Sequence, residues 1–158
     1  MNPGRAGPHV TLRAAGEKDE SVVMEWRNDP DTVRFSATAR PVSAAEHGRW
    51  FTATLADPRR RLWVAEKNGV PVGQVRIDLD GDVGVFSIVV APSERGQGFG
   101  QAMLRAAVAE ITRVRSVSML TAVAREDNPA SIHAFEQVGF SRHGAPEDGF
   151  VTLELRLV

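Results

Sequence analysis

The most informative part of this chain is Ser87–Gln101, with the sequence SIVVAPSERGQGFGQ. An apolar run typical of a strand ends at Pro92, passes through a glycine-rich turn and leads directly into a sequence typical of a helix. Backbone N–H groups of such a turn and of the helix N-terminus after it form a site for an anion, most often a pyrophosphate. The segment therefore predicts a ligand that carries a diphosphate.

The glycines of this turn, Gly96, Gly98 and Gly100, have a spacing that argues against two common nucleotide sites. A dinucleotide fold requires Gly-x-Gly-x-x-Gly after the first strand, whereas this turn follows the fourth strand that we expect. A P-loop requires a Lys-Ser or Lys-Thr pair, which is missing here. What remains is Arg95-x-x-Gly98-x-Gly100, in which the glycines let the backbone approach a pyrophosphate and Arg95 adds positive charge. A turn that binds no ligand is the alternative.

The composition is that of an ordinary globular domain, with 158 residues, of which 42% are hydrophobic and 25% charged. A net charge of −1 offers no basis for a nucleic acid or an anionic membrane as partner. Cysteine is absent, which excludes disulfides, thiolate metal sites and a cysteine nucleophile and agrees with a cytoplasmic location. We expect residues 1–8, rich in glycine and proline, to be a flexible tail and residues 9–158 to be a single domain.

Alternating and helical patterns divide the rest of the chain into strands and helices. Strands are expected at His9–Ala14, Arg61–Lys67, Val70–Leu79, Val83–Ala91, Ser118–Ala124 and Phe150–Leu157. Helices are expected at Glu17–Asn28, from Ser43 to the residue before Asp57, at Gly98–Val114 and at Asn128–Val138. Two tight turns make three of the strands an antiparallel meander, and the helix after the glycine turn joins two strands that should be parallel. This order predicts an α/β fold with a mixed, mostly antiparallel sheet flanked by helices.

A second motif lies downstream, where Asn128, Ser131, Phe135 and Gly139-Phe140 form the pattern Asn-x-x-Ser-x-x-x-Phe-x-x-x-Gly-Phe. Together with the glycine turn, this segment resembles the GNAT superfamily of acetyl-CoA-dependent N-acetyltransferases. The resemblance covers nearly the whole chain, because the expected order of strands and helices is also that of the superfamily.

The resemblance implies that the sheet splays between its fourth and fifth strands, at a bulge, and that the pantetheine arm of acetyl-CoA binds there like an added strand. Backbone N–H groups near Ile88 and Val90 would bind the arm, and one would polarise the acetyl carbonyl. No metal is required. The implied catalytic residues are Ile88, Asn128 and Ser131. The implied cofactor-binding residues are Ile88, Val89, Val90, Arg95, Gly96, Gln97, Gly98, Phe99, Gly100, Gln101, Asn128, Ser131 and Phe135.

The proton transfers are less defined by the sequence. Many members of the superfamily place a tyrosine where Phe135 stands, and this chain contains no tyrosine. The thiolate would then be protonated by Ser131 or water, or leave unassisted, since a thiol pKa of about 8.5 makes it a tolerable leaving group. Glu66 and Asp78 are candidates for the general base, although a carboxylate on a meander strand is more often solvated, and Arg76 is an equally good structural partner for Asp78.

Residues expected to bind the acceptor lie before the meander. Arg27-Asn28, with Pro30 and Thr32 after it and His47 in the next helix, resembles the amino-sugar N-acetyltransferases of pseudaminic acid biosynthesis. The resemblance implies a nucleotide-linked amino sugar as acceptor, with Arg27 and His47 contacting the nucleotide. The expected substrate-binding residues are Arg27, Asn28, His47 and Asp78. A plain helix C-terminus at Arg27-Asn28 is the alternative reading of the same residues.

Other functions are compatible with the same motifs. The acceptor can instead be a protein N-terminus, as in ribosomal-protein acetyltransferases, or another small amine. A regulatory module that senses acetyl-CoA without catalysis is a rival from a different class. A homodimer is possible, because dimers are common in the superfamily.

Overall fold

The computed structural model describes residues 8–114 and 116–157. They form a seven-stranded sheet with the strand order β1-β2-β3-β4-β5-β7-β6. The strands are β1 (Thr11–Ala14), β2 (Arg60–Lys67), β3 (Val70–Asp80), β4 (Val83–Val90), β5 (Met119–Arg125), β6 (Ser141–Arg142) and β7 (Phe150–Arg156). All neighbouring pairs are antiparallel except β4 and β5, which are parallel. The predicted mixed, mostly antiparallel sheet is thus confirmed, and the expected tail lies, apart from Pro8, outside the described residues.

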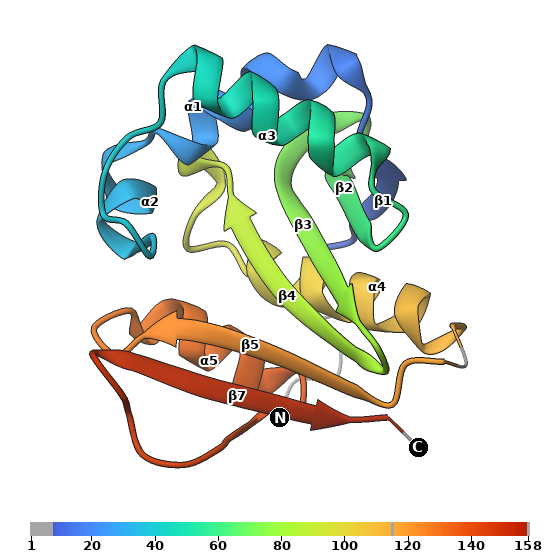
Figure 1. Ribbon diagram of the computed structural model, residues 1–158, viewed down its shortest axis with the longest axis vertical. Coiled ribbons are helices and arrows are strands. Elements are labelled where there is room, and N and C mark those ends of the chain that lie inside the picture. The colour runs from blue at the N-terminus through green and yellow to red at the C-terminus, as the bar shows by residue number, and fades with distance from the viewer. Residues whose placement is uncertain (1–7, 115, 158) are drawn as a thin grey trace.

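Helices cover both faces of the sheet, as Figure 1 shows. They are α1 (Glu20–Arg27), α2 (Pro30–Phe35), α3 (Ala44–Ala56), α4 (Phe99–Thr112) and α5 (Pro129–Gln137), with short 3-10 turns at Glu17–Asp19 and Pro92–Glu94. The larger core cluster packs α4 and α5 on one face of the sheet. The smaller cluster packs α1 and α3 against β2 and the end of β4 on the other face. None of the helices in the described part of the chain is long and apolar enough to span a bilayer.

Helix α2 and strand β6 were not expected from the sequence. The Asp29-Pro30 pair does end α1, because the residue before a proline avoids helical geometry, and Asp29 has a ψ of 135°. The fixed φ of Pro30 then suits the first position of a new helix, and the Asp29 side chain accepts hydrogen bonds from the N–H groups of Asp31 and Thr32. Strand β6 has only two residues, which is too short for an alternating pattern.

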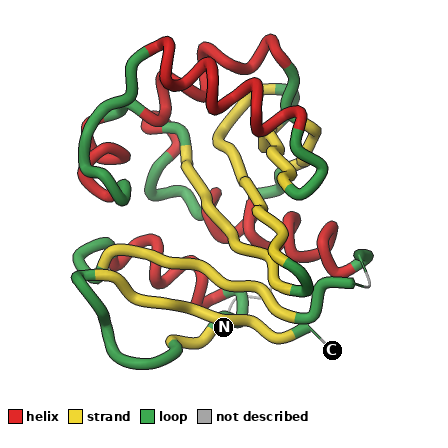
Figure 2. Tube along the Cα trace, viewed as in Figure 1, coloured by secondary structure: helices red, strands yellow, loops and turns green. Residues whose placement is uncertain are grey.

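The sheet divides into two halves between β4 and β5. These strands pair only where Val83–Phe86 lies beside Met119–Ala122. Beyond that, β4 stays with β3 and β5 stays with β7, so the two halves diverge toward the N-terminal end of α4 (Figure 2). The predicted splay is confirmed, but the expected bulge is wrong, because β4 pairs with β3 in unbroken register from Val83 to Val90. Each of the two strands keeps its outer neighbour along its whole length, while the pairing between β4 and β5 ends at Phe86 and Ala122.

Candidate active site

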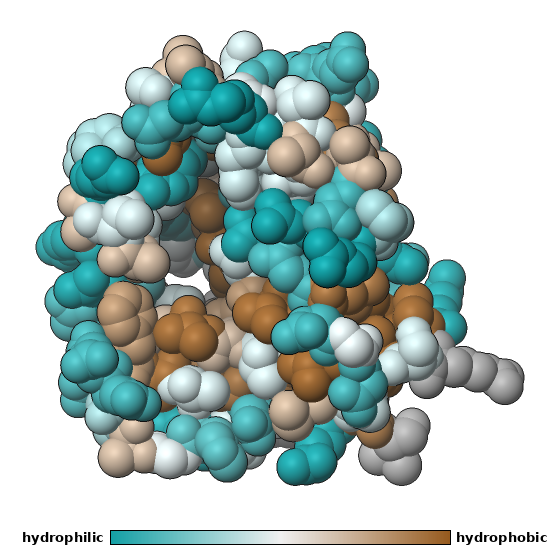
Figure 3. All heavy atoms as spheres, viewed as in Figure 1, coloured by the Kyte–Doolittle hydropathy of each residue, from teal (hydrophilic) through white to brown (hydrophobic). Residues whose placement is uncertain are grey.

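A cleft of about 1000 Å³ fills the space between the two halves of the sheet. Figure 3 shows it as a hollow with apolar atoms below it. Its walls include every residue of β4 from Val85 to Val90. Because successive side chains of a strand point to opposite faces, the cleft must wrap around the free edge of β4 and open on both faces of the sheet. Two ligands can therefore approach the same strand edge from opposite sides.

The backbone of β4 presents N–H groups to this cleft. Ala91 donates its N–H to the carbonyl oxygen of Val72 on β3 at 2.8 Å. Since N–H directions alternate along a strand, the N–H groups of Val90 and Ile88 point to the opposite edge. That edge carries no β5 pairing beyond Phe86. The two backbone groups expected from the sequence thus lie at the free edge, where an extended ligand can accept their hydrogen bonds.

The glycine turn forms the mouth of the cleft at the start of α4. Gly96 and Gly98 have φ angles of 76° and 83°, in the left-handed region that favours glycine. Gly98 is the N-cap of α4, and no side chain caps this helix. A Cβ at Gly100 would lie 3.7 Å from the Val90 side chain and 3.9 Å from that of Ile88, so glycine leaves room at the edge of β4. Open first-turn N–H groups and this free space suit a pyrophosphate with an arm that runs along β4.

Arg95, beside this turn, is bound to α2. Its Nη2 donates to Asp29 Oδ2 at 2.8 Å and to Thr32 Oγ1 at 2.9 Å, and its Nη1 donates to Asp31 Oδ2 at 3.4 Å. Burial alone would raise the pKa of Asp29, but the hydrogen bonds from Arg95 and from the start of α2 outweigh it and hold that pKa below its ordinary value. The sequence did not indicate that Arg95, which we expected to bind the pyrophosphate, already has carboxylate partners.

The first turn of α5 forms the facing wall. Asn128 is its N-cap, with Oδ1 accepting the N–H of Ser131 at 3.3 Å. Phe135 is buried and meets Phe140 edge to face, with ring centroids 5.1 Å apart. Asn128, Ser131 and Phe135 all line the cleft. The structure therefore brings the glycine turn, the β4 edge and the α5 motif together around one space.

On the α1–α3 side, Arg27 and His47 also line the cleft. Arg27 donates to the carbonyl oxygen of Arg40 at 3.2 Å and to Thr38 Oγ1 at 3.4 Å, which holds the loop between α2 and α3, and burial lowers its pKa. His47 is 3% exposed, and neither ring nitrogen has a hydrogen-bond partner among the described residues. Burial lowers the pKa of His47, with Glu20 opposing and Arg27 adding to the effect, which favours a neutral imidazole.

Three candidates lie outside the cleft lining. Asn28 donates to the carbonyl oxygen of Val42 at 2.9 Å and accepts its N–H at 2.8 Å, so both ends of its amide bind backbone. Asp78 accepts from Arg76 Nε at 3.2 Å and lines a separate small hollow. Glu66 pairs with Arg13 at 3.3 Å on the β1–β2 side of the sheet. Each of these groups contacts a neighbouring segment, and their expected roles toward the acceptor or as the base stay predictions.

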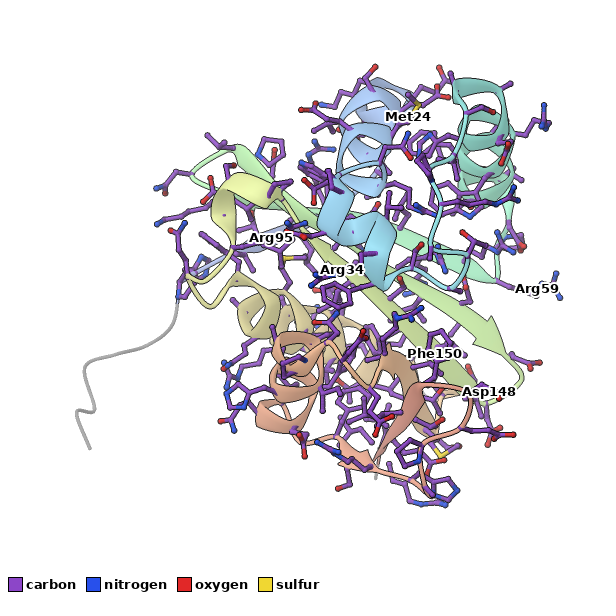
Figure 4. The ribbon with its side chains drawn as sticks, turned by 90° about the vertical axis from the view of Figure 1, so that its left-hand side faces the viewer. Met24, Arg34, Arg59, Arg95, Asp148 and Phe150 are labelled. Carbon is purple, nitrogen blue, oxygen red and sulfur yellow. The ribbon has the colours of Figure 1, made fainter. Side chains whose placement is uncertain are left out.

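The cleft is also lined by side chains for which the sequence predicted no binding role. Arg34 of α2 and Phe150 of β7 come from opposite halves of the molecule (Figure 4), and both line the cleft. The Arg76 guanidinium lies 5.4 Å from the centre of the Trp50 ring. Gln74 is 7% exposed, and its buried Oε1 has no partner among the described residues. Its one available signal was a polar residue in the middle of the apolar Val70–Val75 run.

Within the described residues, no group of three or more His, Asp and Glu side chains is placed to hold a metal ion. A split α/β sheet whose free strand edge, glycine-rich helix start and facing helix enclose one cleft defines the class of CoA-dependent acyltransferases. The chain belongs to the acetyltransferase (GNAT) domain family, whose model matches residues 9–141. It is an N-acetyltransferase, and acetyl-CoA is its acetyl donor.

Relatives and solved structures agree with this assignment. The chain is 26% identical over 151 residues to aminoglycoside N(6')-acetyltransferase type 1 of Klebsiella pneumoniae, covering 85% of this chain and 75% of the relative. The structure of AAC(6')-Ib with paromomycin and acetyl-CoA has a TM-score of 0.82 and 25% identity, covering 94% of this chain and 93% of the other. Spermidine N-acetyltransferase from Vibrio cholerae, solved with CoA and spermine, has a TM-score of 0.82 at 19% identity, covering 94% and 96%, and supports the fold.

The expected fold, enzyme class and acetyl donor are thus confirmed, and the acetyl-CoA-sensing module is set aside. The acceptor is an amine. The named relatives carry no link to a nucleotide-linked sugar, so the particular acceptor, the site-residue roles, the homodimer and the cytoplasmic location stay predictions.

Proposed function

We propose that this enzyme acetylates the primary amine of a small acceptor that also carries an acidic group. The observation that supports this is the charge of the acceptor side of the cleft. Arg27, Arg34 and Arg76 line it, and Arg76 also donates to Asp78, outside the cleft lining, at 3.2 Å. Of the acidic residues that line the cleft, Asp31 is held by Arg95, Glu46 is exposed on α3, and Glu94 lies beside the glycine turn on the cofactor side. Arginine binds phosphate or carboxylate through paired hydrogen bonds, so this wall suits an anion.

The proposal separates this enzyme from relatives that act on polycations. Aminoglycosides and spermine carry several ammonium groups, and like charges placed in a partly desolvated cleft repel strongly. Within the proposed class, a nucleotide-linked amino sugar is the first candidate, with Arg27 and Arg34 near its phosphates. A neutral His47 would then serve as a hydrogen-bonding partner and not as a cation.

For the acetyl donor, we propose that the Arg95–Gln101 turn binds the pyrophosphate and that Ile88, Val89 and Val90 bind the pantetheine arm. Gly96, Gln97, Gly98, Phe99 and Gly100 would shape the turn. Asn128, Ser131 and Phe135 would flank the thioester. The Ile88 N–H would donate to the developing oxyanion, a contribution worth about 3 kcal/mol where such donors have been removed.

The reaction that we propose is a direct attack. The neutral amine attacks the thioester carbonyl carbon, a C–N bond forms, and the C–S bond breaks. The leaving thiolate takes up a proton from Ser131 or from water, and the proton that the attacking nitrogen loses passes to water, from which that donor is protonated again. Phe135 has no proton to give, so this chain depends on Ser131, on water or on the modest basicity of the thiolate.

The test compares matched amines with acetyl-CoA, using release of free coenzyme A as the signal. Glucosamine 6-phosphate and glucosamine differ only in the anionic group, and a UDP-linked 4-amino sugar, spermidine and kanamycin complete the set. We expect kcat/KM to favour the phosphate over the plain sugar by about tenfold or more, the value of one charged hydrogen-bond pair. The preference should shrink in Arg34→Gln and Arg76→Gln. Higher kcat/KM for spermidine or kanamycin would contradict the proposal.

A further inference from the structure

Gln74 lies near the centre of β3, on the strand that pairs with the edge of β4 opposite its free edge. It is paired in register with Val89, and the next pair is Val75 with Ile88. Directly opposite residues of an antiparallel pair point to the same face, and Val89 packs against the α1–α3 cluster. Gln74 therefore faces the acceptor side of the cleft, next to the strand position whose N–H points toward the thioester site.

The amide of Gln74 is buried without the partner it requires. The residue is 7% exposed, and its Oε1 atom has no hydrogen-bond partner among the described residues. A buried carbonyl oxygen that loses water and gains no donor lowers stability, so a leucine of similar size would fold at least as well. The packing of the free protein thus gives no reason for an amide at this position.

A second buried polar group lines the same cleft. His47 stacks beside Phe51 with ring centroids 5.8 Å apart, lies 5.4 Å from the Trp50 ring, and has no partner at either nitrogen among the described residues. Trp50 in turn lies under Arg76, which shares its face of β3 with Gln74. The two groups therefore belong to one continuous wall, held in place by aromatic rings.

The chemistry of the two groups defines what can bind between them. The amide oxygen of Gln74 only accepts hydrogen bonds, and a neutral imidazole accepts at one nitrogen and donates at the other. Both groups can therefore bind a hydrogen-bond donor. The substrate that receives the acetyl group must bring its amine to this part of the cleft, and the amine carries N–H donors.

We propose that Gln74 Oε1 accepts a hydrogen bond from the amino group of the acceptor and orients it for attack, with His47 as its second contact. This assignment rests on the proposed N-acetyltransferase reaction in this cleft. With one N–H bonded to Gln74, the lone pair of the neutral amine is free to point toward the carbonyl carbon of the thioester, beside the Ile88 N–H.

The experiment uses the full chain with Gln74→Leu, Gln74→Glu and the control Gln137→Leu, an exposed glutamine of α5 outside the cleft. The acceptor is glucosamine 6-phosphate, or the UDP-linked 4-amino sugar where wild-type turnover of that compound is higher. The readouts are the thermal midpoint, the calorimetric Kd for acetyl-CoA, and the kcat and KM for the acceptor.

We expect Gln74→Leu to unfold at the same or a higher temperature and to bind acetyl-CoA as wild type does. Its kcat/KM for the acceptor should fall by about tenfold or more. Gln74→Glu keeps an oxygen that accepts from the amine, so its kcat/KM should lie closer to that of wild type. Gln137→Leu should change none of the readouts.

The outcomes separate this assignment from the proposed function. Unchanged acceptor kinetics in Gln74→Leu, or a parallel loss of stability and acetyl-CoA binding, would overturn the role of Gln74 and leave the proposed function intact. A Gln74→Glu variant as slow as Gln74→Leu would also count against it. If wild type acetylates no compound of the set, the proposed function fails before any variant is made, and the assignment fails with it.

Discussion

Arg95 and Asp29 join the two binding sides of the cleft, through a hydrogen bond of 2.8 Å from Arg95 Nη2 to Asp29 Oδ2. Arg95 stands beside the glycine turn, and Asp29 caps α2, which forms part of the acceptor wall. Figure 4 shows Arg95 next to this helix. Helix α2 buries none of its residues, so polar contacts such as this one hold it against the rest of the protein.

The first prediction concerns this contact. Asp29→Asn keeps an N-cap side chain but removes the charge that binds Arg95. We expect KM for the acceptor to rise about three- to fivefold, which corresponds to ~0.6–1 kcal/mol for a partly exposed pair. Acetyl-CoA should bind equally well or more tightly, because the guanidinium is released toward the pyrophosphate. Steady-state kinetics and calorimetry measure both.

The matched control for Asp29→Asn is Glu110→Gln, which breaks an exposed pair with Arg113 at 3.9 Å outside the cleft. Glu110→Gln should change neither the KM for the acceptor nor the Kd for acetyl-CoA. Weaker acetyl-CoA binding in Asp29→Asn, at unchanged KM for the acceptor, would show that the contact serves only the glycine turn.

The second prediction concerns Gly98, whose φ of 83° places it in the left-handed region. Gly98→Ala should lower the free energy of unfolding by about 1 kcal/mol, the usual cost of this conformation with a Cβ. It should also weaken acetyl-CoA binding in calorimetry, because relief of the strain moves the N–H groups at the start of α4. Gly81→Ala is the control, since Gly81 has a φ of 59° and open space around it in the β3–β4 turn. Equal acetyl-CoA affinities in the two variants would contradict the assignment of this turn.

The third prediction concerns Gly73, where β3 approaches β4 and α4 closely. A Cβ there would lie 2.5 Å from the backbone oxygen of Val89 and 2.8 Å from Met103 Cε. A backbone oxygen yields only if β4 moves, so Gly73→Ala should cost about 2–3 kcal/mol of unfolding free energy and lower kcat. A Cβ at Gly16 would meet no atom of residues 8–114 and 116–157 within 4 Å, so Gly16→Ala should change stability by less than about 0.5 kcal/mol. Chemical denaturation compares the two, and equal stabilities would refute the close approach.

The sequence predicted those parts of the site that depend on local backbone chemistry. Gly98 and Asn128 mark helix starts that short-range rules recognise, and they lie in the cleft as expected. The acceptor side depends on which residues the fold brings together. Asn28 is of a residue type common in binding sites, but its side-chain amide forms hydrogen bonds with the backbone of Val42.

Gln74 shows the opposite case. Its burial and its unpartnered oxygen exist only once β3 is packed, and the sequence marks the position only as a polar residue within the Val70–Val75 run. The missed α2 has a similar cause, because a proline that ends one helix also suits the first position of the next.

The last prediction concerns pH and the pair of Arg13 with Asp19. Two hydrogen bonds of 2.8 Å join them, the Gly16 N–H donates to the same carboxylate at 2.8 Å, and Asp19 is 4% exposed. The bonds from Arg13 lower the pKa of Asp19 most, burial opposes them, and the Gly16 N–H adds to the lowering. A carboxyl whose pKa is lower in the folded state contributes stability that is fully present above its unfolded pKa of about 3.9. That stability is lost as the pH falls through the folded value.

Asp19→Asn should therefore lower the free energy of unfolding by about 2 kcal/mol near neutral pH, as expected for a buried charged hydrogen bond. The difference from wild type should shrink as the pH falls below about 4, where protonation begins to remove the same interaction from wild type. Urea unfolding across this range measures it. Asp127→Asn, whose partner Arg125 lies 3.4 Å away and whose side chain is 69% exposed, should cost far less at every pH. A difference between Asp19→Asn and wild type that stays constant into strong acid would show that Asp19 acts through packing and not through its charge.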